Sequence, residues 1–479
     1  MTLATLAIIS GFFAWLLVDH LSGLHGTDRG IDLLVYRAGG HALLTGHSIY
    51  APDFAAINHS PHGLAFTYPP FSAVFFIPLA LLSEGTAQVV MVVLNTAAAV
   101  TLFVVIAVAT QGKWDRLRSW RSLTAPISLK TAIAAVTAAA LFTLSVPVQH
   151  NMLYGQVNLL LAAGVALDLL TPAPVWPRGL LVGIAVAIKL TPAVFIGYFL
   201  VTRQWRALAA SLAGTALATA VGWLVLPSDT ARYLTSTVFQ PARIGGLTYA
   251  SNQSVRGIVE RIPALDGVRA LLCVVATAVV LVLAVIAIEH SRRSADPVAG
   301  VLAAGFIGLL CSPVSWGHHW VWLSAAAVYF LVRWAAVGGV GNLAAGLVVA
   351  TVIRAAPWTH LPKFAERERL WTPFEHVLGS VWALTALSLL VWFAARCRDS
   401  GRPTSPEQKR AAASVQSARG ADEGEQVKRV QHGTDDDCQD AHQDAGHRGA
   451  VVVGLAAPHP STPGDADSDR ARAEDDTTE

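Results

Sequence analysis

Long apolar runs dominate this chain, and short polar or basic connections separate them. A membrane-spanning helix needs about 20 consecutive apolar residues, and some of these runs reach that length whereas others are too short to span alone. The pattern predicts an all-α polytopic membrane protein with about 10–12 transmembrane helices. The runs are residues 2–19, 71–83, 86–110, 131–147, 157–170, 179–200, 207–226, 268–288, 298–311, 320–334, 340–356 and 377–395.

One run contains a strong helix breaker. Residues 179–200 hold the tetrapeptide Lys189-Leu190-Thr191-Pro192 near their centre. A proline inside a helix removes one backbone hydrogen bond and clashes with the preceding turn. Irregular backbone at membrane depth is tolerated where protein or water lines it, so we expect this run to be broken or re-entrant.

Composition agrees with the hydropathy pattern for most of the chain but not for its end. Hydrophobic residues make up 53% of the sequence and charged residues only 14%, which is typical of a chain dissolved in lipid. Residues 399–479 instead carry 17 Asp or Glu and 9 Lys or Arg among Gly, Ser, Pro and Gln. Such a segment buries too little apolar surface to offset chain entropy. We expect a membrane domain over residues 1–398 and a disordered acidic tail, with no catalytic role, over residues 399–479.

The distribution of basic residues predicts the sidedness of the connections, because short cytoplasmic loops are rich in Lys and Arg. Segment 111–130 carries five basic residues and one acidic residue, and Arg292-Arg293 close another span. We place these segments and the tail in the cytoplasm. Loops 20–70 and 227–267 and the polar segment 312–319 then share the extracytoplasmic face of the plasma membrane.

The first external loop places a carboxylate at the start of a helical pattern. Apolar positions within 33–44 recur with helical spacing, which predicts a short amphipathic helix at the membrane interface with Asp32 at its start. Asp32 is either a helix cap, the usual role at such a position, or a base beside the membrane. Tyr36 and Arg37 of this helix, and Tyr68 near the next span, are candidate sugar- or acceptor-binding residues. Tyr68 also fits an aromatic-belt position.

Polar side chains also occur where the chain is otherwise apolar. Gln156 and Asn158 open one run, Asp168 lies toward its end, and Lys189 lies near the middle of the next. The two amides either join helices or bind substrate. A lysine in the membrane costs about 2.5–3.5 kcal/mol on insertion scales and needs a partner. Either a lipid phosphate or a pairing with Asp168 would satisfy Lys189.

Two further motifs lie on the same predicted face. Within residues 249–256, the side chains of Asn252, Gln253 and Ser254 suit sugar hydroxyls, and Arg256 suits a phosphate through a bidentate fork. A solvated loop with nothing bound would have a similar sequence.

The second motif is a histidine pair at the mouth of a span. His318 and His319 follow Trp316, a candidate sugar-binding residue. Adjacent helical residues point about 100° apart, and no HExxH motif or third ligand lies nearby. We therefore prefer phosphate binding by the histidines, and a divalent metal is possible but not indicated. The four cysteines lack a CxxC spacing, which predicts neither a zinc site nor a disulfide framework.

The ordered motifs resemble a known family. Asp32-Leu33-Leu34-Val35-Tyr36, Tyr68-Pro69-Pro70, Gly155-Gln156-Val157-Asn158, Lys189-Leu190-Thr191-Pro192, Asn252-Gln253-Ser254 and Ser315-Trp316-Gly317-His318-His319 occur in this order. Together they look like the actinobacterial polyprenol-phosphate-mannose-dependent alpha-(1→2)-mannosyltransferases, family 87 of the GT-C glycosyltransferases. The resemblance covers about residues 1–396.

The resemblance implies a GT-C-like bundle with short interfacial helices in the first external loop. It also implies an inverting transfer of mannose from polyprenyl-phosphate-mannose outside the cytoplasm to a glycolipid or lipoglycan acceptor. By this resemblance Asp32 is the general base, and His318 or His319 contacts the donor phosphate. Lys189, Arg256 and the histidines can supply positive charge, so no cofactor is required.

Other functions fit parts of the pattern. A secondary transporter or lipid flippase would also have many spans, broken helices and a midplane lysine. It predicts an inverted repeat, however, and the second half has no counterpart of the motif at Lys189. A pentosyl transferase such as an arabinosyl transferase, using the same lipid-phosphate chemistry, is a further alternative. We expect membrane lipids as surroundings and no nucleic acid as a partner.

Overall fold

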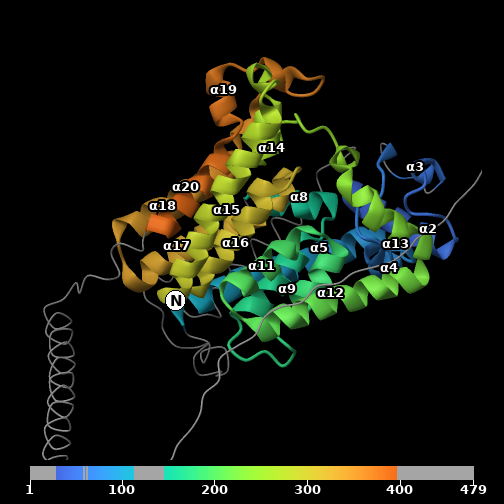
Figure 1. The fold of residues 1–479 in the computed structure, drawn as a ribbon, viewed down its shortest axis with the longest axis horizontal. Helices are drawn as coiled ribbons and strands as arrows, with labels where there is room; N and C mark the ends of the chain where they lie inside the picture. Colours follow the sequence, from blue (N-terminus) through green and yellow to red (C-terminus); the bar gives the residue numbers. More distant parts are fainter. Residues whose placement is uncertain (1–28, 58–59, 61–62, 113–144, 396–479) are drawn as a thin grey trace, which may run out of the picture. The chain divides into compact units, whose positions relative to one another are not determined.

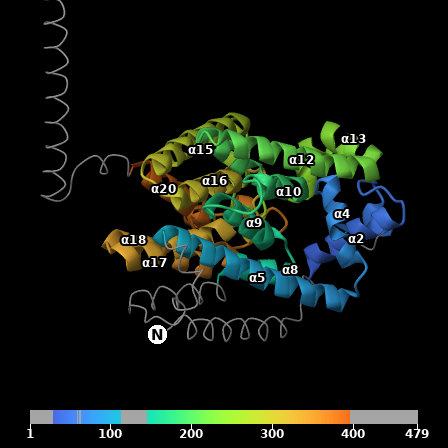
Figure 2. The same cartoon turned by 90° about the horizontal axis from the view of Figure 1, so that it is seen from below.

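The computed structural model describes residues 29–57, 60, 63–112 and 145–395. This part of the chain forms helices and contains no strand (Figures 1 and 2). The predicted run 2–19, most of run 131–147, most of the basic segment 111–130 and the tail lie outside the described residues. The helices are α2 (Ile31–Leu44), α3 (Phe54–Ile57), α4 (Pro70–Ala80), α5 (Glu84–Gln111), α8 (Val146–Tyr154), α9 (Asn158–Leu170), α10 (Leu180–Ile188), α11 (Val194–Val201), α12 (Trp205–Val225), α13 (Pro227–Thr235), α14 (Val255–Glu260), α15 (Arg269–Arg293), α16 (Pro297–Cys311), α17 (Val321–Val337), α18 (Val340–Ala355), α19 (Pro373–Leu378) and α20 (Val381–Ala395).

The described helices are those of an all-α polytopic membrane protein. Within the described residues, four segments are long and apolar enough to cross a membrane, or five if the bent pair α8 and α9 forms one span. This count covers only the described residues, which leave out the predicted run 2–19 and most of run 131–147. Several of the other apolar runs form helices of 10–17 residues. The four segments are Glu84–Gln111, Trp205–Val225, Arg269–Arg293 and Val340–His360. Large apolar side chains such as Leu217 on α12 and Val274 on α15 are exposed, as expected for helices whose outer surface meets lipid.

The bundle centre is formed by α16 and α17, whose residues are almost all buried. Helix α15 packs along α16, α18 packs along α17, and α10 packs along α12. Gly179 and Gly183 permit the last of these contacts, because a Cβ at either position would lie within 2.4 Å of a backbone oxygen of α12. Small residues thus bring the backbones of α10 and α12 close together.

The predicted helix beginning near Asp32 is present as α2. Its N-cap is Gly30, whose φ is 69°, and its N–H donates to the carbonyl of Leu153 at 2.8 Å. Tyr36 is fully buried and stacks on Phe76 of α4 with ring centroids 4.1 Å apart. Arg37 donates to the carbonyls of Leu79 and Leu82. These contacts fix α2 against α4.

Two breaks in the helices bring polar side chains together. Helices α8 and α9 meet at Gly155, whose φ is 69°, and the chain turns by 119° between them. The break expected around Pro192 is also present, since α10 ends at Ile188 and a short 3-10 helix, η3 (Thr191–Ala193), precedes α11. Lys189 between them is extended, with φ −149° and ψ 128°.

Candidate functional site

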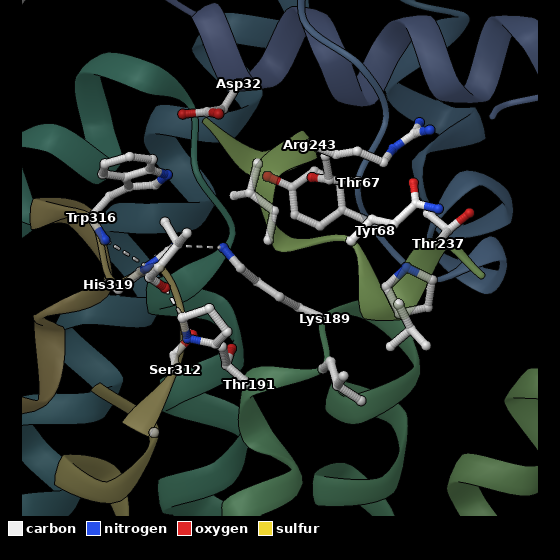
Figure 3. A pocket seen from close by; sticks show the side chains of 18 of the residues that line it. Asp32, Thr67, Tyr68, Lys189, Thr191, Thr237, Arg243, Ser312, Trp316 and His319 are labelled. Carbon is white, nitrogen blue, oxygen red and sulfur yellow. Dashed lines mark hydrogen bonds between the residues drawn. The ribbon is translucent and has the colours of Figure 1, made fainter. Parts of the chain in front are cut away.

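A pocket of about 400 Å³ collects half of the predicted site residues (Figure 3). It lies between α2, the segment before α4, the breaks near residues 155 and 189, the segment 233–244 and the turn before α17. Apolar side chains including Leu190, Val194 and Ile307 form another part of its wall. The predicted site residues that line it are Asp32, Tyr68, Gln156, Lys189, Trp316, His318 and His319.

Asp32 occupies the first turn of α2, inside the helix and two residues after its N-cap. Gly30 is the N-cap, so the alternative that Asp32 caps the helix is wrong. Burial raises the pKa of the Asp32 carboxyl to about 6, and hydrogen bonding with Gln156 and the charge of Lys189 oppose the increase. A carboxylate with this pKa is ionised at neutral pH and is a stronger base than a solvated aspartate.

Lys189 lies at the centre of a hydrogen-bond network of neutral groups. Its Nζ lies 2.8 Å from Asn158 Oδ1 and 3.4 Å from Gln156 Oε1. The third neighbour is His319 Nε2 at 3.1 Å. Nζ also lies 5.4 Å from the centroid of the Tyr68 ring, within range of a cation–π interaction.

The expected alternative of a Lys189–Asp168 pair is wrong. Asp168 instead accepts hydrogen bonds from the backbone N–H groups of Gly179 and Val182, and from the indole of Trp176. The carboxylate therefore fixes the start of α10 rather than neutralising the lysine.

Gln156 and Asn158 order the floor of the pocket. The Gln156 Oε1 atom accepts from the hydroxyl of Tyr36 at 2.7 Å. Asn158 Nδ2 lies 3.1 Å from Asn151 Oδ1 and 3.2 Å from the carbonyl of His318. Gln156 lines the main pocket, whereas Asn158 lines a smaller neighbouring cavity. Both amides join helices, and Gln156 also faces the space available to a substrate.

His319 connects the turn before α17 with Lys189. Its Nδ1 lies 3.1 Å from the backbone nitrogen of Trp316, which donates to it. Burial and the neighbouring Lys189 charge lower the pKa values of His318 and His319 well below the usual range, so both rings are neutral at pH 7.

Among the described residues, no three His, Cys, Asp or Glu side chains group closely enough to hold a metal ion.

The structure does not bring every predicted residue to the pocket. The Arg256 guanidinium pairs with Glu260 one turn later in α14, and its side chain is 40% exposed. Tyr36 and Arg37 lie behind the pocket wall, where they hold α2 against its neighbours.

The amides and hydroxyl predicted to bind a sugar are buried in the loop structure. Asn252 Oδ1 accepts from the backbone N–H of Ser315, and Gln253 donates to the carbonyl of Gly379. Ser254 donates to the carbonyl of Pro313 and caps α14. These three side chains shape the turn that carries Trp316, and they do not line the pocket.

One wall of the pocket was not predicted from the sequence. Tyr233, Thr237, Gln240 and Arg243 line it from α13 and the short helices that follow. A single tyrosine, threonine or arginine in a polar loop has no recognisable spacing, so sequence analysis had no signal for these residues.

Comparisons with known proteins give one family match and several similar relatives. Residues 66–313 match the model of glycosyltransferase family 87. A polyprenol-phosphate-mannose-dependent alpha-(1-2)-phosphatidylinositol mannoside mannosyltransferase of Mycobacterium tuberculosis is 34% identical over 385 residues, which cover 80% of this chain and 87% of the relative. Its namesake of Mycolicibacterium smegmatis is 36% identical, covering 76% of this chain and 81% of the relative.

A third relative differs from these two in its named acceptor. The polyprenol-phosphate-mannose-dependent alpha-(1-2)-phosphatidylinositol pentamannoside mannosyltransferase of Mycolicibacterium smegmatis is 34% identical over 78% of this chain and 86% of its own length. No solved structure matches the chain.

Proposed function

The chain belongs to glycosyltransferase family 87, and on that premise we propose that it transfers mannose from polyprenol-phosphate-mannose to a phosphatidylinositol mannoside or related glycolipid, with inversion, forming an alpha-(1→2) linkage. The activities in the names of three relatives support the donor and the kind of acceptor. The observation that carries the proposal is the Asp32 carboxylate, which lines the pocket, is not the N-cap of α2 and has a pKa of about 6.

The reaction requires one base and one means of stabilising a leaving phosphate. Asp32 accepts the proton of an acceptor hydroxyl as the hydroxyl oxygen bonds to the anomeric carbon of mannose. The bond between that carbon and the phosphate oxygen breaks, and its electron pair leaves with polyprenyl phosphate. A single displacement at a beta-linked donor gives the alpha product, and no covalent sugar intermediate forms.

The developing negative charge needs a preorganised positive environment. Lys189 supports this role, because its hydrogen-bond partners Asn158, Gln156 and His319 are neutral and leave its positive charge in the pocket. We propose that Lys189 supplies the field and that His319 positions it. The histidines remain candidates for contact with the donor phosphate.

We propose further that the enzyme requires no metal. The side chains available as metal ligands support this, since the polar groups of the pocket are one carboxylate, amides, hydroxyls, neutral imidazoles and basic side chains. Transfer should continue in excess EDTA. A loss of activity in EDTA that added Mg²⁺ or Mn²⁺ restores would contradict this part of the proposal.

We propose that the pocket faces the extracytoplasmic side and that the tail is cytoplasmic, as the distribution of basic residues predicts. A cysteine at Gly246, which is exposed and where an added Cβ meets nothing within 4 Å, should react with a membrane-impermeant maleimide in intact cells. Reaction only after the cells are opened would place this face in the cytoplasm.

The decisive experiment compares wild type with Asp32→Asn in proteoliposomes containing radiolabelled polyprenyl-phosphate-mannose and a phosphatidylinositol mannoside. We expect wild type to form an alpha-linked product and the variant to lose nearly all transfer. Because burial raises the Asp32 pKa, the folded state binds this proton more tightly than the unfolded state, and ionisation above pH 6 opposes folding. The neutral variant should therefore melt no earlier than wild type at pH 7.5. An active, folded Asp32→Asn protein would refute the base assignment.

A further inference from the structure

The pocket wall formed by segment 233–244 carries hydrogen-bond donors that have no acceptor. The Nε atom of Arg243 is buried without a partner, and no hydrogen bond or ion pair of its guanidinium is found within the described residues. Arg261, Arg269 and Arg333 also have a buried nitrogen without a partner, but each forms a hydrogen bond or ion pair through another nitrogen. Arg243 therefore differs from these three arginines.

Two hydroxyl groups accompany this guanidinium. The side chains of Tyr233 and Thr237 are more than nine-tenths buried, and both line the pocket with Arg243. No side-chain hydrogen bond is found for either hydroxyl among the described residues. A free guanidinium and two free hydroxyls are donors suited to an anion with several oxygens.

The surroundings of these donors favour an anion attached to a lipid. Leu234, Phe239 and Ile244 belong to the same segment and are 48%, 73% and 41% exposed. Val238 and Ile244 also line the pocket itself. A free phosphate would gain nothing from such neighbours, whereas a lipid phosphate places its hydrocarbon chain against them.

We infer that Arg243, together with Tyr233 and Thr237, binds the phosphate of the lipid-linked sugar donor; this inference rests on the proposed function. In Figure 3, Arg243 lies on the side of the pocket opposite Asp32, Trp316 and His319, with Tyr68 between them. An inverting displacement requires the base and the leaving group on opposite sides of the anomeric carbon. A mannose between Asp32 and Arg243 satisfies this requirement.

The acceptor lipid also carries a phosphate, but pocket size argues against its binding at Arg243. A cavity of about 400 Å³ holds one hexose, its phosphate and the first carbons of a chain. A phosphatidylinositol bearing several mannoses would keep its phosphate several sugars away from the hydroxyl that reacts at Asp32. The nearby phosphate is therefore that of the donor.

Lys189 and Arg243 then have different tasks. The three N–H groups of Lys189 Nζ are directed at Gln156, Asn158 and His319. Lys189 therefore supplies positive charge but has no N–H group left to donate to a phosphate. Arg243 has its hydrogen atoms available and makes the direct contacts. Arg256 was expected to bind this phosphate, but it pairs with Glu260 outside the pocket.

The test compares Arg243→Gln, Arg243→Lys and the control Arg232→Ala. Arg232 is an exposed residue of α13, directly before segment 233–244, and does not line the pocket, so its removal changes net charge equally. The KM for polyprenyl-phosphate-mannose should rise about 10- to 100-fold in Arg243→Gln, because a charge-assisted contact is lost. Arg243→Lys should recover part of this loss, and Arg232→Ala should resemble wild type. The KM for the acceptor should stay within about twofold.

A binding measurement separates this inference from the proposed function. Polyprenyl phosphate, the matching prenol without phosphate and inorganic phosphate are titrated against each folded protein by isothermal titration calorimetry. Arg243→Gln should weaken binding of polyprenyl phosphate only, whatever sugar the enzyme transfers. Unchanged binding, or an increase in acceptor KM alone, overturns the assignment even if wild type transfers mannose. Normal donor-phosphate binding without any mannose transfer would instead reject the proposed function.

Discussion

At the scale of single residues, the pKa of Asp32 predicts the acid limit of the reaction. Only the ionised carboxylate accepts a proton, and burial raises its pKa to about 6. The ratio kcat/KM should therefore fall about tenfold per pH unit below pH 6, whereas a solvated aspartate with a pKa near 3.9 would sustain it to about pH 4. Initial rates measured in proteoliposomes from about pH 4.5 to 8 check this. A flat profile down to pH 4.5 is the contrary outcome.

Replacing His318 and replacing His319 should affect donor binding to different extents. His319 joins the backbone of Trp316 to Lys189, whereas no hydrogen bond of the His318 ring is found in the described part of the chain. Replacing His319 with Ala frees Lys189 to move and should raise the donor KM about tenfold. His318→Ala should have the smaller effect. Parallel donor titrations of the two variants measure it, and equal effects would contradict the positioning role of His319.

Sequence reasoning identified seven of the residues that line the pocket, because a carboxylate, a lysine or paired histidines are unusual beside apolar runs. It misplaced Asn252, Gln253 and Ser254, since a sequence shows which side chains can form hydrogen bonds but not whether they point to a ligand or to backbone. It missed Arg243 because only the folded chain brings that loop opposite Asp32.

At the scale of helices, Gly155 connects the fold with the site. Its φ of 69° permits the bend between α8 and α9, and a Cβ there would lie 2.6 Å from the Cβ of Leu33, the neighbour of Asp32. Gly155→Ala should lose about 2–4 kcal/mol through backbone strain and overpacking.

Gly164 offers a matched control within α9, since a Cβ there meets nothing within 4 Å. Gly164→Ala should be neutral or stabilise the helix by about 0.5–1 kcal/mol. Thermal unfolding in detergent compares the two variants with wild type. Equal melting temperatures for Gly155→Ala and Gly164→Ala would show that the bend tolerates a side chain.

Helix positions were largely predictable from hydropathy, since α12, α15, α16 and α17 begin and end within a few residues of the corresponding apolar runs. The break near Lys189 was also predictable, because proline acts locally. The 119° turn between α8 and α9 was not, because its angle depends on distant partners such as Leu33.

At the scale of the whole molecule, the pocket draws its lining from residues 32 to 319 and from nothing C-terminal to them among the described residues. Removing residues 405–479 should therefore leave kcat/KM within about twofold of the full chain. Proteoliposome assays at matched protein content test this expectation. A large loss of turnover with unchanged thermal stability would assign the tail a role in catalysis.

The apolar side chains Leu190, Val194 and Ile307 share a wall with the polar groups of the pocket. A substrate with a hydrocarbon tail reaches such a wall from the bilayer. Its effective concentration is then its mole fraction among the surrounding lipids, not its amount per litre. Diluting a fixed quantity of donor with inert phospholipid should slow the enzyme, whereas confining the carrier to a small membrane area should accelerate it without any new synthesis.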